Sequence, residues 1–166
     1  PMHRTTARSL AGLLISLGQD ASVERIVLAA DDAEGVTVSQ AEVELAPGAE
    51  YAQTVLTGGA RRQRLQTSVR HPGGHAGLRL DGVYLLDGKR HADLTTVVTH
   101  AAVHGTTEQL TKGVVRDQAR GVFQGRIVVA EGADHTDARM GHHALILSDR
   151  AEVDAKPELE IYADDV

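Results

Sequence analysis

Histidine is the residue type whose number and spacing in this sequence could do chemistry. The 166 residues contain nine histidines and no cysteine, so a metal or iron–sulfur site would lack thiolate ligands. His71 and His75 are four residues apart, but Pro72-Gly73-Gly74 between them is incompatible with a helix. His100 and His104 have the same spacing, and on a helix they could bind one metal. On a strand they would stand about 13 Å apart, a gap that metal–nitrogen bonds of about 2.0–2.1 Å cannot bridge.

A second group of possible ligands lies between residues 134 and 143. His142 and His143 follow Asp134, His135 and Asp137. Adjacent residues of a strand point to opposite faces, so one metal ion would capture only some of these side chains. We therefore expect the histidines to be polar positions on an outer surface and assign no metal ligand. A metal-handling patch is the alternative interpretation.

Nucleotide binding is tested by the stretch from Gly82 to Lys89. A phosphate-binding P-loop has four residues between its glycines and a Ser or Thr after its lysine. Here five residues separate Gly82 from Gly88, and Arg90 follows Lys89. Asp87-Gly88 instead predicts a tight turn between strands. No serine lies in a Gly-x-Ser-x-Gly motif and no carboxylate spacing is typical of an acid–base pair, so we assign no catalytic residue and expect no enzyme.

A repeated pattern predicts the elements that position these side chains. Each copy of the pattern begins with three residues, of which the first and the third are apolar. Three residues that mostly favour turns come next, and an alanine follows them. The pattern occurs four times and ends at Ala21, Ala49, Ala133 and Ala151. The separations between these alanines fit one coil of a solenoid or a multiple of it. Stacked coils bury a core that one coil cannot bury alone, so we expect the four alanines to be mostly buried and to occupy equivalent corners.

Other segments also favour strands. Residues 78–80 and 159–161 alternate apolar and charged side chains, and residues 95–99 are rich in β-branched types. Helical spacing is present at Leu10, Leu13, Leu14 and Leu17, but a strand running into the turn at residues 18–20 is the better interpretation. Residues 108–115 could be helical as well, although Gly113 argues against it.

The composition limits the core and the partners. The chain has no Trp, one Phe and three Tyr, so we expect a core of Val, Leu, Ile and Ala. A net charge of -6 without a basic stripe argues against nucleic acid as a partner. No apolar run reaches the roughly 18 residues of a membrane span, and residues 1–8 lack the layout of a signal peptide. We expect a cytoplasmic protein without a membrane partner.

Several short motifs follow one another in the second half of the sequence. They read GVYLLDGKRHAD at 82–93, HAAVH at 100–104, QLTKG at 109–113, ARGVFQG at 119–125 and KPELEIYADDV at 156–166. In the same order they resemble GLYL-x-DGKQHID, HxxPHC, QLYKG, ARGVFNG and KPQLEIYADDV of the SufD family of iron–sulfur cluster assembly scaffolds. Val103 and Gly105 stand where that family has Pro and Cys. Residues 1–81 fit through strand pattern and turn repeat alone.

The resemblance implies an all-β fold, a right-handed parallel β-helix forming a single domain over residues 1–166. It implies a non-catalytic scaffold that pairs with a SufB-like subunit and acts with the ATPase SufC. The family's cluster-interface segment, KCSHGATVG, and its SufC-binding helical tail come after the position of Val166. Contact with SufC would therefore run through a segment not present here. We expect no cofactor on this chain, because the iron–sulfur cluster would be handled by the complex.

Two other functions remain open: a stand-alone β-helical carbohydrate-active enzyme, and a structural homo-oligomer that has lost the cluster role. The open edge of a β-helix must be capped or paired. We therefore expect the chain alone to form a two-fold homodimer in which the last strands or the faces adjacent to them meet. The predicted partner interface comprises Leu159, Ile161, Tyr162, Asp164, Asp165 and Val166.

Overall fold

The computed structural model describes residues 8–166. In this part of the chain the regular elements are all strands, and no helix could cross a membrane. The strands are β1 (Arg8–Leu17), β2 (Ser22–Ala29), β3 (Val36–Leu45), β4 (Glu50–Thr57), β5 (Arg62–His71), β6 (Gly77–Leu86), β7 (His91–His100), β8 (Thr106–Val115), β9 (Arg120–Val129), β10 (Asp137–Ile146) and β11 (Glu152–Ile161).

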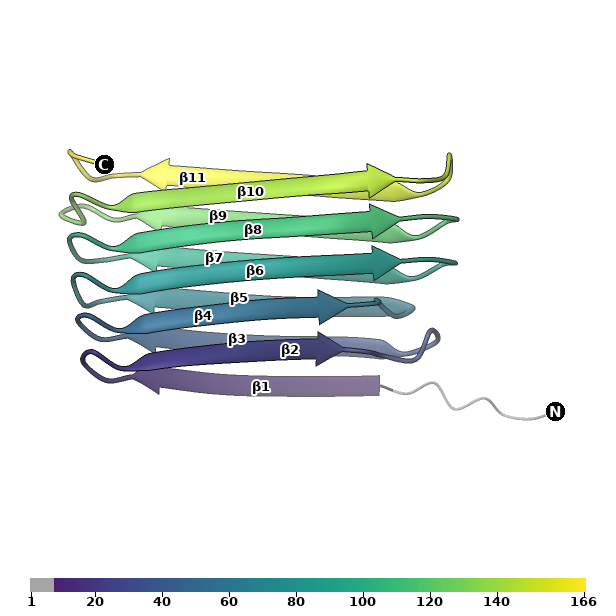
Figure 1. Cartoon of the computed structure of the whole chain (residues 1–166), viewed down its shortest axis with the longest axis horizontal. Helices are drawn as coiled ribbons and strands as arrows, with labels where there is room; N and C mark the ends of the chain where they lie inside the picture. Colours follow the sequence, from purple (N-terminus) through teal and green to yellow (C-terminus); the bar gives the residue numbers. More distant parts are fainter. Residues whose placement is uncertain (1–7) are drawn as a thin grey trace.

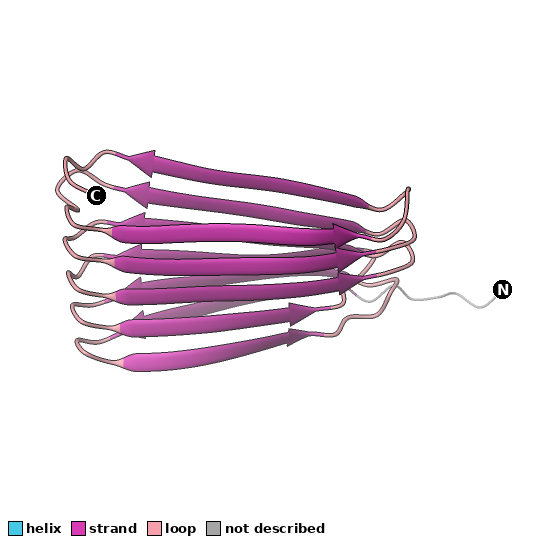
Figure 2. Ribbon diagram, turned by 45° about the horizontal axis from the view of Figure 1, so that its top comes forward, coloured by secondary structure: helices cyan, strands magenta, loops and turns pink. Residues whose placement is uncertain are grey.

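The strands form two facing parallel sheets. The odd-numbered strands make a six-stranded sheet in the order β1-β3-β5-β7-β9-β11, and the even-numbered strands make a five-stranded sheet from β2 to β10. In Figure 1 the even strands run to the right in front and the odd strands run to the left behind, while the chain climbs from β1 to β11. This path is a right-handed β-helix. Figure 2 shows that turns alone connect the two sheets. The predicted fold class is confirmed.

Alternation of side chains explains why these segments form strands. In β8 every second residue, from Thr107 to Val115, is buried between the sheets, and the residues between them are exposed or half-buried. Parallel pairing in register places the same side of each strand inward in every coil. Positive-φ glycines help to close the turns, including Gly88 in the Asp87-Gly88 turn. That turn joins β6 and β7, and Arg90 N–H donates to the Asp87 carbonyl oxygen at 3.1 Å.

The segments with helical spacing are strands. Residues 10–17 lie in β1, which pairs along its whole length with β3, and residues 108–115 lie in β8, between β6 and β10. The segments at 78–80, 95–99 and 159–161 lie in β6, β7 and β11, as predicted. Pairing across coils therefore decides between strand and helix where local spacing allows both.

The prediction about the four alanines is partly wrong. Ala49, Ala133 and Ala151 are buried, but Ala21 in the first coil is only half-buried. The corners are also not equivalent, because Ala151 lies between β10 and β11, at the opposite end of the coil from the other three. The step from Ala133 to Ala151 is thus the passage from one sheet to the other and not a full coil.

The core contains more than aliphatic side chains. Tyr51, Tyr84 and Phe123 are fully enclosed, together with leucines, valines and isoleucines from both sheets. Polar side chains also point inward and pair with one another. Gln53 donates to Thr67 at 3.0 Å, and Gln109 donates to Thr96 at 2.8 Å. Such pairing removes most of the cost of burying an amide. The expectation of a purely Val, Leu, Ile and Ala core was therefore wrong.

Candidate functional site

The last coil, β10 and β11, leaves its apolar inner side uncovered. Ile146, Leu159 and Ile161 are 51%, 55% and 47% exposed. Their partners one coil below, Val115, Ile127 and Val129, are at most 1% exposed. The same inward pattern thus builds a buried core in one coil and an exposed face in the next. We call the inward residues of β10 and β11, with Val166, the C-terminal end surface.

The predicted interface residues divide into two groups. Leu159, Ile161 and Val166 line a shallow hollow of the C-terminal end surface, and Tyr162 beside them is 62% exposed. The structure therefore brings the predicted apolar residues together. Tyr162 donates its hydroxyl hydrogen to Glu160 at 3.2 Å, which holds the ring at the rim of this surface.

Asp164 and Asp165 instead bind back to the turn between β9 and β10. Asp164 N–H donates to an Asp134 carboxylate oxygen at 3.2 Å, and His135 N–H donates to the Asp165 carbonyl oxygen at 2.7 Å. The Asp165 carboxylate lies 3.0 Å from Nδ1 of His135. These two acids therefore fix the end of the chain over that turn.

The backbone edges of β10 and β11 differ. The amides of Asp137 and Leu147 donate to the coil below, so alternation places the amides of the even-numbered residues of β10 on its free edge. In β11 the amides of Glu152 and Tyr162 face β9, so the odd-numbered residues face the free edge. Pro157 is one of these and has no N–H. The free edge of β10 thus has a complete set of donors, whereas that of β11 is interrupted.

Two histidines lie inside the β-helix, which corrects the expectation that they occupy an outer surface. His71 and His100 are fully buried register partners with ring centroids 4.3 Å apart. Nε2 of His100 is 2.9 Å from the Thr107 hydroxyl, while both ring nitrogens of His71 lack a hydrogen-bond partner within the described residues. Burial, and then the neighbouring His100, lower the pKa of His71 to about 3; burial lowers the pKa of His100 to about 4. Both rings are therefore neutral at physiological pH.

His142 and His143 point to opposite sides of β10, as expected for adjacent strand residues. His143 is exposed, whereas His142 stacks on Phe123 with ring centroids 5.0 Å apart. Nε2 of His142 lies 2.9 Å from the hydroxyl of Tyr84. Burial, and then the charge of His143, lower the pKa of His142. Its inward position corrects the expectation of an outer polar site.

Three other histidines stack on the outside of the turns. His75, His104 and His135 are exposed, and adjacent ring centroids are 4.7 and 4.8 Å apart. No three metal-ligating side chains within residues 8–166 already converge on one point. Spacing within one strand or turn does not reveal histidines that meet one coil apart. The signal was the repetition of His-x3-His, first at 71/75 and again at 100/104.

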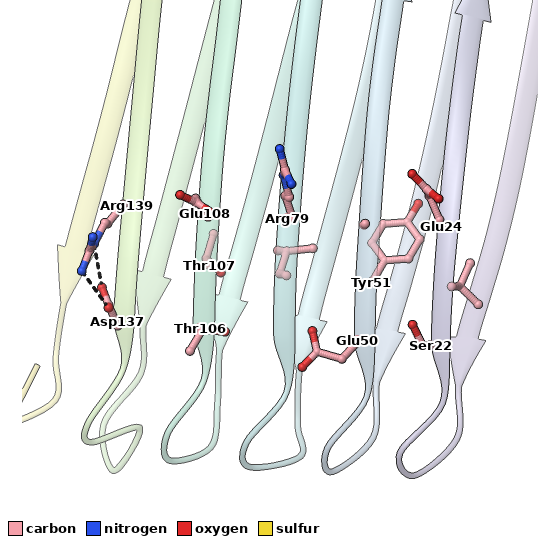
Figure 3. Close-up of a pocket in the computed structure, with 13 residues that line it drawn as sticks. Ser22, Glu24, Glu50, Tyr51, Arg79, Thr106, Thr107, Glu108, Asp137 and Arg139 are labelled. Atoms are coloured by element: carbon pink, nitrogen blue, oxygen red, sulfur yellow. Dashed lines mark hydrogen bonds and ion pairs between the residues drawn. The ribbon is translucent and has the colours of Figure 1, made fainter.

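A polar groove crosses the outer face of the five-stranded sheet (Figure 3). Arg79, Glu108 and Arg139 stand in one row across β6, β8 and β10, so their charges alternate. Arg139 also pairs with Asp137 at 3.1 Å. Tyr51 is the one aromatic residue of the groove lining in the described chain, and at 1% exposure it offers no ring face to a sugar. The groove therefore gives little support to a carbohydrate-active enzyme.

Comparison with known proteins finds a matching family model and several similar proteins. Residues 4–166 match the family model described as the SUF system FeS cluster assembly SufBD core domain. The chain is 34% identical over 165 residues to iron–sulfur cluster assembly protein SufD of Escherichia coli, covering 99% of this chain and 38% of that protein. It is 27% identical to a SufBD family protein of Synechocystis, and the match covers 92% of this chain and 34% of that protein. It is 33% identical to SufD of Bacillus subtilis, and this match covers 48% of this chain and 18% of that protein. The chain thus spans less than two-fifths of the length of these relatives.

Proposed function

Since this chain belongs to the SufBD core-domain family, we propose that it is the core of a non-catalytic scaffold subunit for iron–sulfur cluster assembly. In this proposal its C-terminal end surface pairs with a SufB-like subunit, and the ATPase SufC acts through a segment outside this sequence. The observation that carries the proposal is the family match over residues 4–166, together with the parallel β-helix that these residues form.

The shape and chemistry of this surface favour another β-solenoid as the partner. A coil end presents a flat apolar floor together with a backbone edge, and both are matched by the end of a second β-helix. The free edge of β10 supplies a regular row of amide donors, and the neighbouring apolar residues supply the area that becomes buried. A SufB-like subunit is the family member we assign to this position.

We further propose that the iron–sulfur cluster is cargo of the complex and not a cofactor of this chain. The sequence contains no cysteine, and thiolates are the usual protein ligands of such clusters. The enclosed His71 and His100 cannot reach a cluster at the surface. Anaerobic reconstitution of this chain is expected to yield no stable stoichiometric cluster. The cytoplasmic location remains a prediction from the sequence.

Co-purification with a SufB-like subunit tests the proposed pairing. Ile161→Lys places a charge in the hollow of the C-terminal end surface, and burying an unpaired charge is costly. We expect at least a tenfold loss of co-purified partner, which corresponds to about 1.4 kcal/mol. Leu85→Lys is the matched control, because Leu85 is 60% exposed on the outer face of β6.

The pairing would be contradicted if both variants retained the partner equally, provided that circular dichroism shows both to be folded. A loss in both variants would also argue against this surface as the specific site. A second substitution in the surface, Leu159→Lys, distinguishes a local effect at one position from loss of the whole interface.

A further inference from the structure

One column of turn residues carries three histidines in succession. Asp20, Gly48, His75, His104 and His135 all have positive φ, between 56° and 69°. The amide of each of the first four donates to the residue preceding the next member, for example His104 N–H to the Asp134 carbonyl oxygen at 3.0 Å. The five residues therefore occupy the same place in successive turns, which stack at the left of Figure 1.

The turn itself does not require an imidazole. It requires a residue that tolerates the left-handed region, and Gly48 and Asp20 meet this need in the first two coils. The next three coils instead present rings that stack almost in parallel, with interplanar angles of 12° and 21°. We call His75, His104 and His135 the histidine ladder. Its rings are open to solvent and carry nitrogen donors at one-coil intervals.

Asp165 gives the ladder a feature typical of metal sites. Its carboxylate lies 3.0 Å from Nδ1 of His135, and the two side chains are 68% and 54% exposed. A hydrogen bond donated by Nδ1–H to this carboxylate leaves the lone pair on Nε2 for a ligand. Metal-binding histidines commonly donate their second ring N–H to a carboxylate in this way.

We propose that the histidine ladder binds a divalent transition-metal ion such as Zn²⁺ or Ni²⁺, with His104 and His135 as the principal ligands. Asp165 orients His135, and His75 lies one coil further from this ion, beyond His104. Two nitrogens of one tetrahedral centre lie about 3.4 Å apart, given bonds of about 2.0–2.1 Å. The adjacent rings, with centroids 4.8 Å apart, must tilt toward each other, which exposed side chains do by rotation about χ1 and χ2. Binding of the ion would thus bring together ring nitrogens that do not converge on one point in the ion-free chain.

The test is titration of the whole 166-residue chain, without an affinity tag, with Zn²⁺, Ni²⁺ and Mg²⁺. Calorimetry is expected to show binding of Zn²⁺ and Ni²⁺ but not of Mg²⁺, which prefers oxygen ligands. Nitrogen-15 spectra of the imidazoles are expected to shift at the ladder and not at the buried His71 and His100.

His104→Asn is the decisive variant, because His104 is the central ring and asparagine tolerates positive φ. We expect its affinity for Zn²⁺ to fall at least tenfold. His143→Asn, which alters an exposed histidine on β10, is the matched control and is expected to bind like the unaltered chain. Should His104→Asn fail to fold, His135→Asn and the nitrogen-15 shifts of the unaltered chain decide.

Three results would overturn the metal site. They are no Zn²⁺ binding up to about 1 mM, unchanged affinity in the ladder variant, and an equal loss in His143→Asn. The outcome does not depend on the proposed scaffold function, since the assay uses no partner subunit. Loss of partner binding with intact Zn²⁺ binding would therefore contradict the scaffold proposal alone.

Discussion

At the scale of single residues, the buried pair of His71 and His100 is the most consequential feature. Both rings are excluded from solvent, and His71 has no hydrogen-bond partner for either nitrogen within the described residues. Each is therefore held in its neutral form by the fold. In the unfolded chain the same histidines are exposed to solvent and can take up a proton. Acid therefore protonates them in the unfolded state before it does so in the folded state.

The first prediction concerns pH. Between pH 6.5, the ordinary histidine pKa, and the lowered values of about 3 and about 4, the unfolded chain binds protons that the folded chain does not. Stability is therefore complete above pH 6.5 and falls as the pH decreases below it. At pH 5 each histidine is expected to cost about 2 kcal/mol of unfolding free energy. Urea unfolding at pH 7.5 and pH 5 measures this.

His71→Leu is the informative variant for this effect, because it removes one titrating ring while keeping an apolar side chain at the site. Its loss of stability between pH 7.5 and pH 5 should be smaller than that of the unaltered chain by about 2 kcal/mol. An unchanged pH dependence would show that His71 does not control acid sensitivity.

A second residue-scale prediction concerns Gly113. The enclosed Tyr84 ring lies directly over Gly113 and Gly121, where a methyl group on either residue would overlap it. Gly113→Ala is therefore expected to lower the free energy of unfolding by about 1–3 kcal/mol through overpacking. Gly12→Ala, where no neighbour lies within 4 Å, is the control and should lose no stability. Equal thermal unfolding of the two variants would contradict this account.

At the scale of elements, the turns determine which residues meet across coils. The turn between β7 and β8 covers residues 101–105, whereas that between β9 and β10 covers 130–136. The stretch of chain from His104 to His135 is consequently longer than that from His75 to His104. A repeat of fixed length along the sequence therefore does not align the three histidines of the ladder.

The sequence pattern was sufficient for the strands but not for the site. Alternation and turn residues marked β3, β6 and β11, because both are local properties of the chain. Local alternation also could not separate a half-coil from a full coil, so Ala151 was placed at the wrong corner. The burial of His71 and His100 depends on register between strands, which no single strand records.

The element-scale prediction is that Ala133→Glu is strongly destabilising. Ala133 is fully buried in the turn before β10, where a carboxylate would lose its hydration without a partner. A loss of about 2 kcal/mol or more is expected in urea unfolding. Ala11→Glu, at an exposed alanine of β1, is the control with the same change in charge. Comparable stability of the two variants would show that the turn can open to accommodate the acid.

At the scale of the whole molecule, the outer face of the six-stranded sheet is crossed by ion pairs, and the coil of β10 and β11 leaves an apolar side uncovered. Arg120 and Arg126 pair with Asp154 and Glu160 across the outer face of β9 and β11. Such exposed pairs contribute little to stability. The C-terminal end surface therefore offers more apolar area for association than this ion-paired sheet face.

We predict that the chain alone forms a two-fold homodimer through this surface. Burial of its apolar residues supplies the driving force, and the nearby acids weaken association less as salt increases. Sedimentation velocity at several concentrations measures the state. Ile161→Lys is expected to shift the protein to monomer, while Leu85→Lys should not. A strictly monomeric chain at all concentrations would show that the end is capped within the fold.

The missing amide of Pro157 bears on how far such association can extend. A β-helix has two different ends, and joining the end of one copy to the start of the next would create an open-ended fibre. Fibre growth requires each new edge to template a full set of backbone hydrogen bonds. Pro157 removes one donor from the middle of the exposed edge of β11, where a prolonged cross-β ladder would need it. Pro157 thereby weakens head-to-tail pairing through the six-stranded sheet by one backbone hydrogen bond.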